Sequence, residues 1–138
     1  MNYYIDVPCV DITHKYMGFN FKKPARAGHV YIKHDHITWN GKQASFRSSY
    51  ELEYAKKLDR MKIDYETETL KIPYWDTQQR KKRIAVPDFY LPATNTIIEV
   101  KGQFYYDEKE MIDRFIAYRD EGYKCVLILD GFPKTLKY

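Results

Sequence analysis

The chain has 138 residues, 44% of them hydrophobic and 17% aromatic, which is enough for one globular domain with one modest core. It holds no apolar run near the roughly 20 residues that span a bilayer, and its start lacks the features of a signal peptide, so we expect an intracellular protein with no membrane segment. All of the net charge of +4 lies in residues 1–47, which hold seven basic and three acidic residues. This imbalance indicates either an anionic partner at one end or a solvated basic tail.

Residues 1–45 read as a small basic N-terminal extension, and residues 46–138 as the main domain. Residues 1–28 show no clear periodicity and are expected to be irregular. Residues 36–46 read as a hairpin, because Asn40-Gly41 can supply the positive φ angles of a two-residue turn. Histidines occur around this hairpin, but no cysteine lies nearby, so we do not expect a zinc site.

A helix is expected over residues 49–62, with Ser48 or Ser49 as its N-cap. At 100° per residue, Glu51 points into the centre of the apolar face of this helix, whereas Glu53 points to solvent. The side chain of Glu51 is thus expected among apolar residues rather than in solvent, which favours a functional role for Glu51. The alternative is a capping box, because Ser48 and Glu51 have the spacing of that motif.

The rest of the chain alternates between strands and a helix. Residues 65–74 read as a strand, and a polar loop leads to a second strand over 84–91. A short turn leads to a third strand over 97–101, and a helix over about 106–121 is stopped by Gly122. The apolar run at 124–130, which includes a core thiol at Cys125, reads as a buried strand. The three strands can form an antiparallel meander, and the last can pair in parallel after a helical crossover, which predicts an α/β fold with a mixed sheet.

Three charged side chains interrupt the central strands of this predicted sheet. Side chains alternate between the faces of a strand, so Glu99 and Lys101 share one face. The turn between the strands brings Asp88 beside Glu99, and Glu51 arrives from the covering helix. Clustered carboxylates need a cation, and oxygen-only ligands suit Mg²⁺ or Mn²⁺. The predicted chemistry is metal-assisted phosphodiester hydrolysis, with Lys101 at the attacking water or the phosphate. The alternative is a surface ion pair between Glu99 and Lys101.

These residues resemble a known signature. Pro87-Asp88, followed after ten residues by Glu99-Val100-Lys101, resembles the PD-(D/E)XK motif of restriction-type nucleases. The stretch FRSSYE, which ends at Glu51, is similar to a helix in the junction-resolving endonucleases of some tailed phages and in transposase-associated and phage homing endonucleases. The resemblance implies a restriction-endonuclease-like core of helix, three-strand antiparallel meander, helix and parallel strand. It also implies that Asp88, Glu99 and Glu51 are metal ligands and that Lys101 is the catalytic lysine.

Other residues are candidates for supporting roles. Basic side chains that could contact DNA phosphates are Lys42, Arg47, Arg80, Lys81, Lys82 and Arg83, although the last four could equally be a solvated hairpin tip. Gln103 would continue the polar row of the third strand if that strand runs on. Glu66 matches, weakly, an accessory acidic position of the junction-resolving relatives.

We therefore expect a Mg²⁺-dependent endonuclease acting on double-stranded DNA, of the site-specific homing kind, with residues 1–45 as a possible DNA-recognition element. A single site in a small domain implies a homodimer or sequential nicking, and no organic cofactor is expected. If the protein is encoded by a phage, it would act in the cytoplasm of the host cell. A Holliday-junction-resolving enzyme, a non-catalytic DNA-binding module on the same fold and an RNA nuclease stay open as alternatives.

Overall fold

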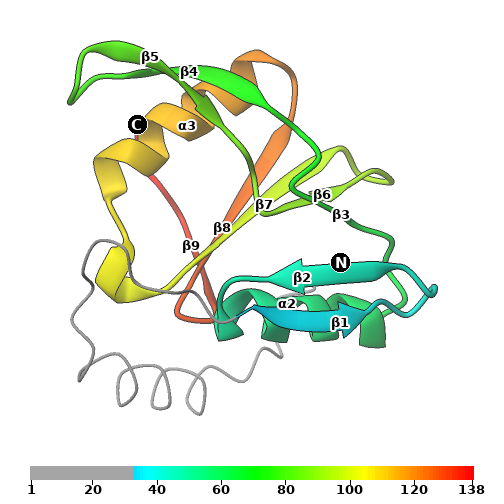
Figure 1. The fold of residues 1–138 in the computed structure, drawn as a ribbon. Helices are drawn as coiled ribbons and strands as arrows, with labels where there is room; N and C mark the ends of the chain where they lie inside the picture. The colour runs from blue at the N-terminus through cyan, green and yellow to red at the C-terminus, as the bar shows by residue number, and fades with distance from the viewer. Residues whose placement is uncertain (1–32) are drawn as a thin grey trace.

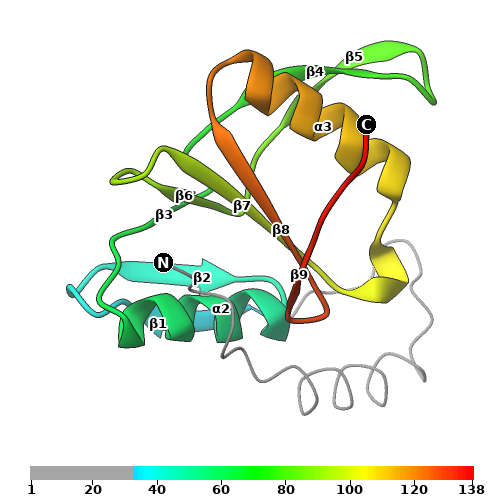
Figure 2. The ribbon, with the colours of Figure 1, turned by 180° about the vertical axis from the view of Figure 1, so that it is seen from behind.

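A five-stranded mixed sheet with one helix on each face forms the centre of the computed structural model, which describes residues 33–138 (Figures 1 and 2). Most of the predicted N-terminal extension thus lies outside the described residues. The elements in chain order are β1 (His34–Ile37), β2 (Gln43–Phe46), α2 (Ser49–Arg60), β3 (Glu66–Thr67), β4 (Ile72–Asp76), β5 (Lys81–Ala85), β6 (Phe89–Leu91), β7 (Thr96–Lys101), η1 (Gln103–Tyr105), α3 (Glu108–Asp120), β8 (Lys124–Leu129) and β9 (Phe132–Lys134). Neither helix of this part of the chain could cross a membrane.

The central sheet has the order β3-β6-β7-β8-β9. Strands β3, β6 and β7 are joined by antiparallel pairings, and β7 pairs with β8 in parallel after the α3 crossover. The predicted α/β fold with a mixed sheet is therefore confirmed. Strand β9, which pairs antiparallel to β8 at the edge, was not predicted, because its three residues are all exposed and carry no alternating pattern.

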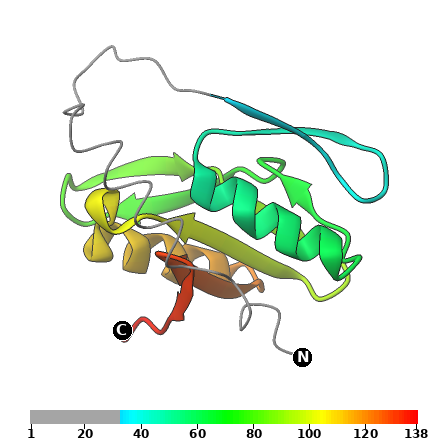
Figure 3. The same ribbon diagram turned by 90° about the horizontal axis from the view of Figure 1, so that it is seen from below.

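Helix α2 begins where the sequence predicts. Ser48 is the N-cap, and its side chain accepts a hydrogen bond of 3.1 Å from the backbone N–H of Glu51. The inward face of α2 buries Tyr54, Ala55 and Leu58 against one face of the sheet, where Ile98 and Val100 belong to the same cluster. Figure 3 shows α2 and α3 on opposite sides of β7. Lys57, on the same helix, is only 3% exposed.

Two of the predicted strands are each divided in the structure. The stretch read as one strand over 65–74 splits into β3 and β4, because Glu68 adopts a φ of 55° and turns the chain between them. The stretch over 84–91 splits into β5 and β6 around Pro87, which has no N–H to donate to a ladder. The expected polar loop between them is instead a two-stranded hairpin, β4–β5, closed by a turn in which Arg80 has a φ of 57°.

Helix α3 covers the other face of the sheet. Asp107 is its N-cap and accepts hydrogen bonds from the N–H groups of Lys109 and Glu110. Gly122 follows the helix with a φ of 97°, as predicted for its C-terminal glycine. Met111, Phe115 and the apolar residues of the β4–β5 hairpin form the second core cluster beneath it.

The β1–β2 hairpin forms a separate two-stranded ribbon that lies along α2 (Figures 1 and 3). Its existence was predicted, but its turn was not, because only Gly41 has a positive φ. The N–H of Thr38 donates to the carbonyl of Lys42 at 2.8 Å, which leaves a three-residue loop with the glycine in the left-handed position. His36 contacts the carboxylate of Asp59 on α2, so this histidine has a structural partner.

Candidate functional site

Strand β7 carries the central residues of the predicted site. Its side chains alternate as expected, since Ile98 and Val100 pack in the cluster beneath α2, whereas Ile97 packs in the cluster beneath α3. Glu99 lies on the α3 side of the strand with Ile97, and its side chain is 0% exposed. A carboxylate at the centre of a sheet is costly unless it is paired, so its partners decide what it can do.

Glu99 is held by two residues of α3. The hydroxyl of Tyr118 donates to Oε2 at 2.5 Å, and a guanidinium nitrogen of Arg114 lies 3.3 Å from the same oxygen. The other oxygen, Oε1, is buried and has no hydrogen-bond partner within residues 33–138. One oxygen is therefore fixed while the second is left to bind a further group.

Asp88 stands beside Glu99 at the point where β6 leaves β7. It lies in a bend just before β6, and its Oδ2 accepts a hydrogen bond of 2.8 Å from the N–H of Val100. Its pKa is raised well above the usual range, first by burial and then by the negative charges of Glu99 and Glu51. The nearby ammonium of Lys101 acts in the opposite direction.

Lys101 is the last residue of β7 and is partly exposed. Its carbonyl accepts a hydrogen bond of 2.9 Å from the N–H of Asp130, which ties the end of β7 to the turn after β8. The charge of Lys101 lowers the pKa values of both Asp88 and Glu51. The ammonium at the end of β7 therefore interacts electrostatically with the carboxylates of Asp88 and Glu51.

Glu51 lies in the first turn of α2, which covers the face of β7 opposite to Glu99. It therefore does not approach Glu99 across that face, and its electrostatic interactions are with Asp88 and Lys101. Burial raises the pKa of Glu51, whereas a hydrogen bond from the backbone N–H of Arg47 and the charge of Lys101 lower it. Asp88 thus interacts electrostatically with the three other predicted residues, Glu51, Glu99 and Lys101.

The remaining candidates are more scattered. Glu66 accepts a hydrogen bond from Thr69. Strand β7 ends at Lys101 and Gln103 begins η1, so Gln103 does not continue the row of polar side chains on β7. Lys42 and Arg47 are exposed at the ends of β2, and Arg80, Lys81 and Lys82 are exposed at the tip of the β4–β5 hairpin. Arg83 is different, because it forms an ion pair of 3.1 Å with the buried carboxylate of Asp76.

Three residues near the site were missed. Arg114 and Tyr118 hold Glu99, and the negative charge of Glu68 raises the pKa of Glu51. A helical periodicity could have found the first two, because Arg114 lies three residues after Met111 and four before Tyr118, on the inward face of α3. Glu68 gave no signal, since it lies in an irregular connection with a positive φ.

The donor set fits a hard cation only in part. Among the His, Cys, Asp and Glu side chains of the described residues, no group of three could hold a metal ion. Two carboxylates and water are nevertheless a common set for Mg²⁺, which keeps several waters in phosphate-handling sites. Asp88 and the unpaired Oε1 of Glu99 offer those oxygens. That Glu51 joins them as a third ligand stays a prediction.

Comparison of the chain with known protein families, with curated proteins and with solved structures finds no match in any of the three. The candidate function therefore depends on the motif and on the geometry of the described residues.

Proposed function

We propose that the chain is a Mg²⁺-dependent endonuclease that hydrolyses phosphodiester bonds in double-stranded DNA, and that its sheet and helices are a restriction-endonuclease-like core. Two independent features support the proposal. The spacing of Asp88, Glu99 and Lys101 resembles the nuclease signature, and the helix, meander, helix and parallel strand follow one another in the order of that core.

The observation that carries the proposal is the unequal environment of the two Glu99 oxygens. Tyr118 and Arg114 satisfy Oε2, whereas Oε1 is buried without a partner in the described part of the chain. A buried acceptor without a donor costs about 1–3 kcal/mol, so such an atom needs an explanation. A cation held by Glu99 and Asp88 would satisfy this oxygen, and it would offset the repulsion from Glu99 and Glu51 that adds to burial in raising the pKa of Asp88.

In this proposal Asp88 and Glu99 hold Mg²⁺, with Mn²⁺ as a substitute and Glu51 as a further ligand or support. The ion, when bound, supplies Lewis-acid stabilisation of the phosphate oxygens. Lys101 orients the attacking water and offsets negative charge that develops on the phosphate. The bond between the water oxygen and phosphorus forms as the bond to the leaving oxygen of the deoxyribose breaks. The attacking water gives up a proton to solvent, and the leaving oxygen takes up a proton from solvent to become a hydroxyl.

The test is incubation of the purified full chain with supercoiled plasmid, a linear duplex and a four-way junction, each with Mg²⁺ and with EDTA. We expect nicking or linearisation with Mg²⁺ only, and loss of at least about a hundredfold in Glu99→Ala and Lys101→Ala. Glu53→Gln and Lys56→Ala are the matched controls, because both residues lie on the solvent side of α2 and pair with each other. Both controls should cleave like the wild type.

The outcomes separate the alternatives. Cleavage unaffected by Glu99→Ala and by EDTA would refute the proposed site. Binding of DNA without cleavage in any divalent ion would favour a non-catalytic module. Preference for the junction regardless of its sequence would favour a junction-resolving enzyme over a site-specific one. Sedimentation of the protein on a duplex should give two chains per DNA, because one site per chain implies a homodimer for double-strand cleavage.

A further inference from the structure

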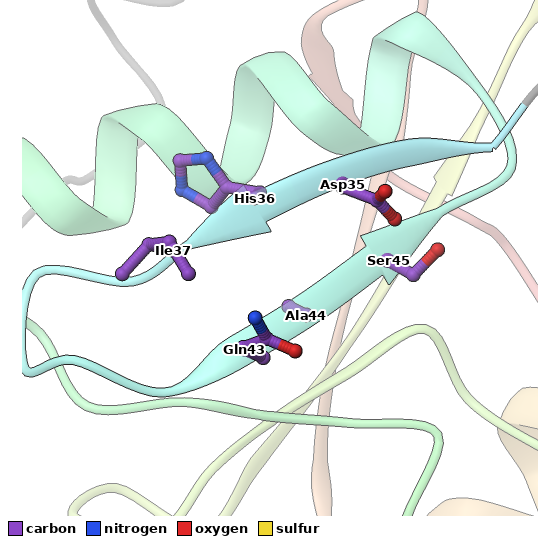
Figure 4. Close-up of a pocket in the computed structure, with 6 residues that line it drawn as sticks. All are labelled: Asp35, His36, Ile37, Gln43, Ala44 and Ser45. Atoms are coloured by element: carbon purple, nitrogen blue, oxygen red, sulfur yellow. The ribbon is translucent and has the colours of Figure 1, made fainter.

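The β1–β2 ribbon has one buried face and one solvated face. Directly opposite residues in its register are Asp35 and Ser45, and Ile37 and Gln43, and all four are exposed. The alternate residues turn inward, where Phe46 is buried in the core cluster with residues of α2. Figure 4 labels these four side chains on the two strands. Together with His36 and Ala44 they line a shallow hollow of about 530 Å³. The packing of the domain leaves this face without a structural task.

The exposed face carries the side-chain types that recognise DNA bases. Glutamine pairs with adenine, a carboxylate accepts from the amino group of cytosine, serine suits either, and an alkyl group contacts the thymine methyl. These are the groups of Gln43, Asp35, Ser45 and Ile37. The major groove, about 12 Å wide, admits a two-stranded ribbon. Side chains two residues apart lie about 6.8 Å apart along a strand, which matches about two base steps of 3.4 Å.

Basic residues flank this face at both ends. Lys33 precedes β1, Lys42 lies in the loop and Arg47 follows β2, and all three are exposed. Residues 33–47 contain one acidic residue, Asp35, so the ribbon carries a positive balance that complements a polyanion. Phosphate contacts of this kind position a protein, whereas base contacts specify the sequence. Within residues 33–47, the large apolar side chains that are exposed are Ile37 on this face and Trp39 in the loop, where the ring N–H of Trp39 donates to the carbonyl of Ile63. The other exposed groups of the ribbon are polar or basic, which favours nucleic acid over a protein partner.

We infer that the β1–β2 ribbon enters the major groove of duplex DNA and reads about two to three base pairs through Asp35, Ile37, Gln43 and Ser45. This deepens the proposed function and rests on it for the link to cleavage. Ser45 lies six residues before Glu51, and an extended chain of six residues spans at most about 22 Å. The bases that are read therefore lie within about one helical turn of the phosphate that is cut.

Two measurements test the ribbon and the nuclease separately. Selection of bound sequences from a randomised duplex library in EDTA reports recognition without cleavage, and sequencing of plasmid ends cut in Mg²⁺ reports cleavage. The variants are Asp35→Ala and Gln43→Ala, both at exposed positions, with thermal melts to show that they fold. Gln78→Ala is the matched control, because this glutamine is exposed on the other hairpin.

We expect the wild type to select a short motif, and each ribbon variant to lose about tenfold of its discrimination at one base pair while its affinity for random duplex is retained. The control should keep the full motif. A motif unchanged in both ribbon variants, or no selected motif at all, would overturn the inference even if the enzyme cuts DNA. Selection of a motif that depends on Gln43, without any Mg²⁺-dependent cleavage, would support the ribbon and refute the proposed function.

Discussion

Replacing Tyr118 by phenylalanine tests whether α3 holds the Glu99 carboxylate. The hydroxyl of Tyr118 lies 2.5 Å from Oε2, and both side chains are 0% exposed. A hydrogen bond to a charged group contributes about 1.5–3 kcal/mol to stability. Phenylalanine keeps the ring and its packing against Phe115, so no cavity term is added. For a domain of this size, that loss lowers the melting temperature by roughly 5–15 °C.

The assay is thermal and urea unfolding at pH 7 in EDTA. Tyr106→Phe is the matched control, because the hydroxyl of Tyr106 contacts Glu108 at 3.4 Å near the surface. We expect this control to lose no more than about 0.5 kcal/mol. A double-mutant cycle of Tyr118→Phe with Glu99→Gln isolates the pairwise energy, which should be at least about 1 kcal/mol.

Two results would refute this reasoning. One is a Tyr118→Phe variant that is as stable as Tyr106→Phe. The other is a cycle with no coupling between Tyr118 and Glu99, which would mean that the hydroxyl contributes nothing through the carboxylate. If the proposed function is correct, Tyr118→Phe should also weaken Mg²⁺ binding in calorimetry, because the Glu99 side chain loses the donor that orients it.

Three further predictions concern stability and reactivity. Asp88→Asn should stabilise the metal-free protein at pH 7, because the folded state raises the pKa of this carboxyl. The gain should vanish below about pH 3.8, where the carboxyl is protonated in both the folded and the unfolded state. An equal or lower melting temperature of the variant at pH 7 would contradict this prediction. Asp76→Asn should destabilise the protein at pH 7, because hydrogen bonds, first from Gln79 and then from Arg83, lower the pKa of Asp76 in the folded state. The loss of stability relative to the wild type should shrink as the pH falls below 3.8. A loss that does not change with pH would refute the role of the Asp76 charge. Burial raises the pKa of the Cys125 thiol to about 12. In a Cys9→Ser variant, this thiol should therefore react with a disulfide reagent at pH 8 far more slowly in the folded protein than in the protein unfolded in urea. Equal rates in the folded and unfolded protein would contradict this prediction.

Local patterns predicted the helices and the central strands well. Ser48 and Gly122 mark helix ends through backbone chemistry that is independent of tertiary packing. The strand predictions were wrong where the chain turns at a residue other than glycine, at Glu68 and Arg80. Positive φ angles at such residues depend on the surrounding fold. As a result, a hairpin within the meander was read as a loop.

The site was predicted in part for a similar reason. Spacing within β7 and across the turn to Asp88 is a local property, and the structure keeps Asp88 next to Glu99 as expected. The partner residues come from α3, and their positions depend on how that helix crosses the sheet. The face of the sheet that α2 covers also depends on tertiary packing, so the helical angle of Glu51 could not show that α2 packs on the face of β7 opposite to Glu99.

The proline before Asp88 explains why the site lies at this point of the sheet. The β6–β7 ladder ends at the pairing of Phe89 with Ile98, and its continuation would place Pro87 opposite Val100. Proline has no N–H to donate to the ladder, so the pairing of the two strands stops there. Just past this point, the N–H of Val100 donates to the side chain of Asp88. That bond holds the Asp88 carboxylate beside the buried Glu99, where burial first, and then repulsion from Glu99, raises the pKa of Asp88. The N–H of Val100, just past the end of the β6–β7 ladder, thus helps to hold the two acidic side chains together.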